Sequence, residues 1–255
     1  MLTILSTEWL KLKHTSIHIM MIAVPAFISI CSASYFSYQI KFQNSLIMEG
    51  FFSLWTAVIL PLIVGVLAGY LVQEEEVAGN FTGFLCTNIS RGKLYLGKLL
   101  MIWFQVSIMT IIATGILCFG VERIREDNEA ILAFSIASFF TIIGTLPIIG
   151  IALWVSFLWG MGASIGVGII SLLIGTLLGT TNLGDGIWFF VPWCWDIKIS
   201  MLPNIYFFQG NREILSEVMV QLIQIIFLIT IGFFLFLLGG MIWFSRWEGR
   251  KHSEV

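Results

Sequence analysis

Residues 92–99, GKLYLGKL, are one of two stretches whose residue types and spacing could do chemistry. They match G-x-x-x-x-G-K, the start of a loop that binds nucleotide phosphates, but Leu99 stands where a Ser or Thr would hold Mg²⁺. The stretch also runs into an apolar segment instead of joining a strand to a helix, and no soluble segment is long enough for a nucleotide-binding domain. We therefore expect no nucleotide site in this chain.

Residues 162–166, GASIG, match the G-x-S-x-G pattern of serine hydrolases, in which a histidine activates the serine. The histidines of this chain are His14, His18 and His252, and none is placed to reach Ser164. Small residues in an apolar run let two helices approach closely. We expect helix packing here, and an intramembrane protease remains the alternative from a different class.

Side chains that bind metals or transfer protons are scattered along the chain. Cys31, Cys86, Cys118 and Cys194 show no spacing typical of a disulfide framework or of a metal site. No acidic pair or lone charge occurs within the apolar runs, whereas ion-coupled carriers and proton pumps usually place an ionisable group inside the bilayer. We therefore predict a protein that is not an enzyme and that receives its energy from a partner.

Charged residues gather in the segment 73–98, QEEEVAGNFTGFLCTNISRGKLYLGK, between two apolar runs. Its acids come first and its bases last, and its serine can cap a helix that carries the bases into the next run. A short surface helix between them could offer aromatic side chains to a socket on a partner. The residues with these expected roles are Glu74, Glu75, Glu76, Phe81, Phe84, Ser90, Arg91, Lys93 and Lys98. An ordinary solvated loop explains the same composition, and both interpretations stay open.

Membrane helices must position these residues, because the chain is 58% hydrophobic and 11% charged, with a mean hydropathy of +0.96. Soluble domains carry about 25% charged residues. Runs without Asp, Glu, Lys or Arg cover 14–40, 51–73, 99–121, 130–184 and 218–245. A bilayer core about 30 Å thick takes roughly 20 residues as helix, so the fourth run predicts two helices, 131–153 and 161–178, that turn near 154–160. The sequence predicts an all-α polytopic membrane protein with six spans in a single domain, 1–255.

The distribution of lysine and arginine predicts which side of the membrane each loop faces. Six spans place both termini on one side, and with that side inside, eight basic residues face the cytoplasm and five face outward. The inner set is Lys11, Lys13, Arg91, Lys93, Lys98, Arg246, Arg250 and Lys251, and the outer set is Lys41, Arg123, Arg125, Lys198 and Arg212. Both termini and the segment 73–98 are therefore expected in the cytoplasm.

The N-terminal segment 1–14 shows a second kind of membrane element. Its apolar residues Leu2, Leu5, Trp9 and Leu12 recur at helical spacing, with charged residues elsewhere around the helix. A short amphipathic helix that lies in the membrane interface fits this pattern. The alternative is the frayed, charged start of the first span.

The layout resembles the permeases of ATP-binding-cassette (ABC) exporters of the six-helix, short-loop type. In that family an acidic residue, a Gly-Thr or Gly-Asn pair, a Ser-Arg pair and a Gly-Lys pair form the region that docks on the ATPase. The matching residues here are Glu75 or Glu76, Gly79 with Asn80, Ser90 with Arg91, and Gly97 with Lys98. Ile89 replaces a proline that is common before the Ser-Arg pair. The resemblance implies that 73–98 is a coupling loop and that ATP and Mg bind to a separate ATPase, with no cofactor in this chain.

The segment 180–217 lies outside in this topology, and its PWCW core at 192–195 resembles the permeases of lantibiotic immunity transporters. A proline favours an extended start, so the two tryptophans after it should share one face that receives an amphiphilic, often cationic peptide, while the segment dips into the membrane and returns. The residues expected to contact substrate or gate its path are Trp188, Phe189, Phe190, Pro192, Trp193, Trp195 and Asp196. An aromatic belt at the membrane surface explains the same residues, and both interpretations can hold.

The resemblance implies a permease subunit in a bacterial plasma membrane that expels an amphiphilic antimicrobial peptide, a lantibiotic, from the producer's own membrane. The expected partners are two copies of an ABC ATPase, a second homologous permease chain, the peptide and membrane lipid, with no nucleic acid. Permeases for bacitracin-type or other antibiotics and lipids share most of these features. A peptide sensor without transport activity is a further alternative.

Overall fold

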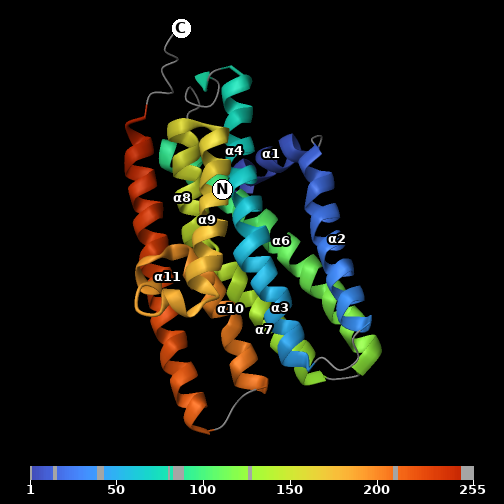
Figure 1. The fold of residues 1–255 in the computed structure, drawn as a ribbon. Helices are drawn as coiled ribbons and strands as arrows, with labels where there is room; N and C mark the ends of the chain where they lie inside the picture. The colour runs from blue at the N-terminus through green and yellow to red at the C-terminus, as the bar shows by residue number, and fades with distance from the viewer. Residues whose placement is uncertain are drawn as a thin grey trace.

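The computed structural model describes residues 2–13, 16–38, 43–79, 81–82, 89–125, 128–208 and 212–247. Within these ranges every regular element is a helix, and the helices form one bundle with α2 and α11 at opposite sides (Figure 1). The elements are α1 Leu2–Lys13, α2 Ser16–Tyr38, α3 Asn44–Leu54, the π-helix η1 Trp55–Ile59, α4 Leu60–Val77, α6 Arg91–Arg125, α7 Asn128–Gly144, α8 Leu146–Trp159, α9 Met161–Gly179, the 3₁₀ turns η2 Asn182–Gly184 and η3 Trp188–Phe190, α10 Pro192–Phe208 and α11 Arg212–Ser245. The predicted all-α class is confirmed.

Six helical stretches of the described chain are long and apolar enough to cross a membrane. They are Ile17–Phe36, Asn44–Val77, Arg91–Val121, Glu129–Trp159, Met161–Gly179 and Leu215–Ser245. This number confirms the prediction of six spans in a polytopic membrane protein. The turn expected near 154–160 lies at Gly160, whose φ of 92° suits a residue without a side chain.

The second span begins earlier than the charge pattern predicted, because Glu49 lies within α3. The span continues through η1 into α4 without a break, and Pro61 accounts for the widened turn there. A proline lacks the N–H that would bond the carbonyl four residues earlier, and helices absorb such a defect as a π-turn or kink. The Trp55 Nε1 donates to Thr110 Oγ1 of α6 at 3.3 Å, which holds this turn against its neighbour.

Small residues bring α4 and α9 into close contact. A methyl group added at Gly65 would lie 2.7 Å from the Ser164 carbonyl oxygen, and one at Gly168 would lie 2.8 Å from the carbonyl oxygen of Pro61. The buried Ser164 hydroxyl donates to the Gly65 carbonyl at 2.8 Å. Such packing associates helices in lipid, where apolar burial supplies no drive. The packing interpretation of the G-x-S-x-G stretch is therefore supported, with Ser164 and Gly168 as the contacting residues.

Helix α10 is inserted among three spans, because three successive side chains each face a glycine of a different helix. The facing pairs are Trp195 with Gly232 of α11, Asp196 with Gly144 of α7, and Ile197 with Gly179 of α9. Successive helical residues are about 100° apart, so neighbours in sequence reach different partners. A methyl group at each glycine would lie 2.5–2.6 Å from the facing side chain, so α10 has little room to shift.

The described part of the segment 180–217, which we expected to dip and return, consists of η2, η3, the 17-residue α10 and the start of α11. The extended start expected after Pro192 is wrong, because Pro192 is the first residue of α10. A proline fits that position well, since the first N–H groups of a helix have no intrahelical partner. Trp193 and Trp195 consequently point about 200° apart around the helix and do not share a face.

Candidate functional site

Lys98 of α6 is 1% exposed and lies where α1, α4 and α6 meet. Its Nζ donates to Glu75 Oε1 at 3.0 Å, to Glu8 Oε2 at 3.2 Å and to the Leu71 carbonyl oxygen at 3.0 Å. We refer to Glu8, Glu75 and Lys98 as the Lys98 junction. Because removing one partner of a buried ion pair is strongly destabilising, the junction fixes the N-terminal helix to both spans that flank the charged segment.

Arg91 connects the start of α6 with the end of α11. Its Nη1 donates to the carbonyl oxygens of Trp247 at 2.6 Å and of Ser245 at 3.3 Å. The last carbonyls of a helix have no intrahelical donor and carry partial negative charge, so a guanidinium group satisfies and stabilises them. Ser90 occupies the predicted capping position before α6, where its carbonyl oxygen accepts from the Leu94 N–H at 3.3 Å.

Phe81 is held against the same end of the bundle. Its backbone has a φ of 65° and its N–H donates to the Glu75 carbonyl oxygen at 3.1 Å. The ring is 1% exposed and packs edge-on against Trp247, with ring centroids 4.9 Å apart. The chain that leaves α4 is therefore folded back onto the end of α11.

The residues expected to dock on a partner fall into three groups. The side chains of Glu75, Phe81 and Lys98 are buried within this chain, and their role in docking stays a prediction. The exposed or half-buried residues are Glu74, Glu76, Gly79, Ser90, Arg91 and Lys93. Asn80 and Phe84, with most of the expected surface helix, lie outside the described residues.

Sequence reasoning did not assign roles to Glu8 and Trp247 at this end. Glu8 is the only acid before Glu49, and its place in a helix whose other charged residues are lysines is a signal that could have marked it as a partner for a buried base. Trp247 gave no comparable signal, because its contacts with Arg91 and Phe81 join parts of the chain that are far apart.

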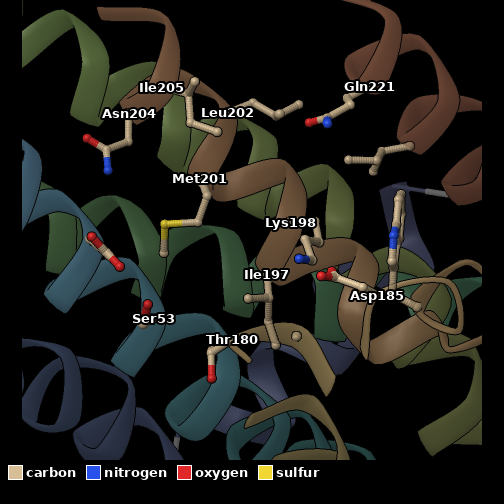
Figure 2. Close-up of a pocket in the computed structure, with 14 residues that line it drawn as sticks. Ser53, Thr180, Asp185, Ile197, Lys198, Met201, Leu202, Asn204, Ile205 and Gln221 are labelled. Atoms are coloured by element: carbon tan, nitrogen blue, oxygen red, sulfur yellow. The ribbon is translucent and has the colours of Figure 1, made fainter. Parts of the chain in front are cut away.

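A cavity of about 450 Å³ opens among α3, the end of α9, α10 and α11 (Figure 2). We refer to it as the α10 pocket. Its polar or charged lining residues are Glu49, Ser53, Thr180, Asp185, Lys198, Asn204 and Gln221, and its apolar ones include Trp188, Met201 and Ile205. Residues 197, 201 and 204 follow one stripe of α10 and residues 198, 202 and 205 the next, so this helix supplies one wall.

Asn204 is the most deeply buried polar side chain of the pocket wall, at 4% exposure. Its Oδ1 has no hydrogen-bond partner among the described residues. Figure 2 shows Lys198 and Asp185 on the other side of Met201 from Asn204. The pocket wall thus combines one base and two acids with a buried, unsatisfied acceptor.

The aromatic residues predicted for this region take different positions. Trp188 lines the pocket and stacks on Phe189, with ring centroids 3.8 Å apart. Phe190 is 85% exposed, while Trp195 is buried and its Nε1 donates to the Phe189 carbonyl oxygen at 3.1 Å. Trp193 is half-buried against the main core. The segment therefore presents an exposed aromatic edge, which the buried Trp195 anchors through its hydrogen bond to Phe189.

Asp196, one of the residues expected to contact substrate or gate its path, is enclosed by neighbouring helices. It is fully buried against Gly144, and neither carboxylate oxygen has a hydrogen-bond partner among the described residues. Burial raises the pKa of Asp196 well above its usual range, because an apolar site disfavours the charged form. An enclosed carboxyl group is out of reach of a peptide at the surface.

A protein-family model described as "ABC-2 family transporter protein" matches residues 4–174. The matched range includes all three residues of the Lys98 junction and the segment between α4 and α6, and it ends within α9. A comparison with curated proteins returns no match.

Proposed function

Because this chain belongs to the ABC-2 transporter family, we propose that it is the permease subunit of an exporter that clears an amphiphilic peptide from the cell membrane. Membership makes the chain a multi-pass membrane component of an ABC transporter and implies an ABC ATPase as partner. The finer proposal is a lantibiotic immunity permease that pairs with a second homologous permease and two ATPase copies in a bacterial plasma membrane.

The end of the bundle near the Lys98 junction is suited to receive mechanical work. A push on the segment between α4 and α6 acts on Glu75 and Lys98, and through Glu8 it also acts on α1. The Arg91 contact passes the same displacement to the end of α11. We place this end in the cytoplasm, with exposed Lys93 and half-buried Glu76 at the ATPase contact.

We infer the substrate class from the α10 pocket and from an exposed apolar edge next to it. The edge consists of Leu183, Ile187, Phe189 and Phe190, which are 67%, 53%, 37% and 85% exposed. The pocket next to it is lined by both kinds of side chain, with charged or amide groups such as Glu49 and Asn204 beside apolar ones such as Trp188. A cavity of mixed polarity next to an apolar rim matches a ligand that has one polar and one apolar part.

The test is to express the chain with its ATPase and sister permease in a peptide-sensitive host and to measure survival. Phe190→Ser removes the most exposed ring of the edge without touching a buried contact, so the protein should insert at normal levels. We expect tolerance of an amphiphilic cationic peptide to fall by about tenfold, as one lost aromatic anchor can remove more than about 1 kcal/mol of binding.

The matched control is Phe139→Ser, a change of the same kind at an exposed ring of α7. It should leave peptide tolerance at the wild-type level. Equal tolerance in wild type and Phe190→Ser, at equal protein abundance, would contradict the proposed substrate contact. Peptide binding and signalling without a fall in cell-associated peptide would favour a sensor over an exporter.

A further inference from the structure

We propose that the α10 pocket binds the primary ammonium group of an amphiphile, with Glu49 as counter-charge and Asn204 Oδ1 as hydrogen-bond acceptor. The inference rests on the proposed function, because it names the polar group of the substrate that the exporter would handle. It assigns a binding role to Glu49, Asn204 and the residues around them.

The charged side chains that line the pocket include more acids than bases. Glu49 and Asp185 are acids, and Lys198 is the one base among the described lining residues. Two acids against one base leave one carboxylate that no base of the lining balances, and this excess favours a cationic ligand. We assign the counter-charge to Glu49, which lines the pocket from α3.

Asn204 adds a preference for a ligand that donates a hydrogen bond. Its Oδ1 is buried and has no hydrogen-bond partner among the described residues, although it lines the pocket. A buried acceptor without a donor is costly, so a ligand N–H group at this point would relieve the penalty. A primary ammonium group supplies both the positive charge and N–H donors, whereas a quaternary ammonium group supplies only the charge.

The wall from α3 supports a site of this kind. Glu49 and Ser53 are four residues apart in α3, so they share one face of the helix, and both line the pocket. A volume of about 450 Å³ holds a headgroup or a lysine-like side chain with part of an alkyl chain, not a whole peptide. Trp188 and Ile205 give the alkyl part an apolar surface.

The experiment uses the full chain in phosphatidylcholine nanodiscs, a lipid without a primary ammonium group. Binding of dodecylammonium and of dodecyltrimethylammonium is measured by equilibrium dialysis. We expect the primary ammonium to bind about tenfold more tightly, because one charge-assisted hydrogen bond changes the affinity by about this factor. Equal affinities for the two probes in the wild type would overturn the proposal.

Two variants test the residues. Glu49→Gln changes an exposed side chain and should fold normally, and Asn204→Leu keeps the shape of the side chain while removing the acceptor. Each should weaken dodecylammonium binding about tenfold and remove its preference over the quaternary probe. Glu76→Gln, the same chemical change at the far end of the bundle, is the control and should bind as the wild type does. Unchanged affinity in both pocket variants would also overturn the proposal.

The source of the ammonium group is settled by changing the competitor. If the natural ligand is an aminophospholipid, nanodiscs of phosphatidylethanolamine should weaken dodecylammonium binding in the wild type but not in Glu49→Gln. If it is a peptide, a lysine-containing amphipathic peptide should displace the probe equally in both lipids, and its acetylated form should not. Either result supports the site and names its source.

These measurements distinguish an error in the proposed binding site from an error in the proposed export function. Probe binding that depends on Glu49, together with no peptide tolerance in cells, would leave the site standing and contradict peptide export. Tolerance in cells that is unchanged by Glu49→Gln, with no probe preference in nanodiscs, would leave export standing and contradict the site.

Discussion

Lys98 and Asp196 are both ionisable and both buried, yet their surroundings are opposite. Lys98 has two carboxylates and a carbonyl oxygen around its Nζ, whereas Asp196 has no hydrogen-bond partner among the described residues and faces Gly144. A paired buried charge binds helices to one another, while an unpaired one favours its neutral form. Ion pairs therefore hold the Lys98 junction together, and close steric fit at three glycines holds α10.

The two regions also differ in their relation to the family match. The matched residues 4–174 contain the whole Lys98 junction, while α10 and α11, which supply most of the pocket wall, follow the match. The end proposed to dock on the ATPase therefore lies within the matched range, and the proposed ligand pocket lies mostly beyond it. Four substitutions test whether the two regions differ in this way.

The largest effect is expected for Lys98→Met. The change leaves Glu8 and Glu75 buried without their ammonium partner, so the free energy of unfolding should fall by about 3–5 kcal/mol. Thermal unfolding in detergent measures it. Lys93→Met, five residues earlier on the same helix and exposed, should leave the melting temperature unchanged. Equal melting temperatures for Lys98→Met and wild type would show that the junction does not hold the helices.

A smaller loss is expected for Gly144→Ala at the α10 contact. The added methyl group would lie 2.5 Å from Asp196 Oδ1 and 2.9 Å from its Cα, so α7 and α10 must separate. Overpacking of this kind costs about 1–3 kcal/mol. The control is Gly115→Ala in α6, where an added methyl group meets nothing within 4 Å, and this variant should be slightly stabilised. Stability that is unchanged by Gly144→Ala would mean that steric fit does not hold α10.

Asp196→Asn should raise stability at neutral pH. Because the folded pKa of Asp196 is raised, the wild type has its full stability below about pH 3.9, the usual pKa, and loses it as the pH rises through the folded pKa. Asparagine carries no such penalty, so we expect a melting temperature about 2–4 °C higher at pH 7.5, equivalent to about 1 kcal/mol. The difference should disappear as the pH is lowered toward 4. A gain that does not change with pH would exclude titration of Asp196 as its cause.

The smallest effect on stability is expected for Lys93→Glu, which should instead weaken the contact with the ATPase. Lys93 is exposed at the start of α6, so the melting temperature should stay at the wild-type value. Co-purification of the ATPase should fall several-fold. Lys198→Glu, the same reversal in the pocket, should leave co-purification intact. Full ATPase recovery with Lys93→Glu would move the docking surface away from this residue.

Local features of the sequence were enough to predict the number of spans and the helical N-terminus. A span is recognised by the length of its apolar run, and α1 by apolar residues at helical spacing, and neither requires knowledge of a neighbour. The G-x-S-x-G stretch was interpreted as packing because no histidine was placed to reach Ser164, and the contact between Ser164 and Gly65 supports that interpretation.

Tertiary structure alone decided which charges are buried and which residues share a cavity. Glu8 and Lys98 are 90 residues apart in sequence, so their contact depends on how α1 packs on α6. The α10 pocket draws its wall from three helices, the end of α9 and the segment after it, and no local pattern joins them. Pro192 shows why the sequence alone could not decide the structure of this segment. A proline suits either an extended start or the first turn of a helix. Here Pro192 begins α10, and glycines of α7, α9 and α11 accommodate that helix in close packing among them.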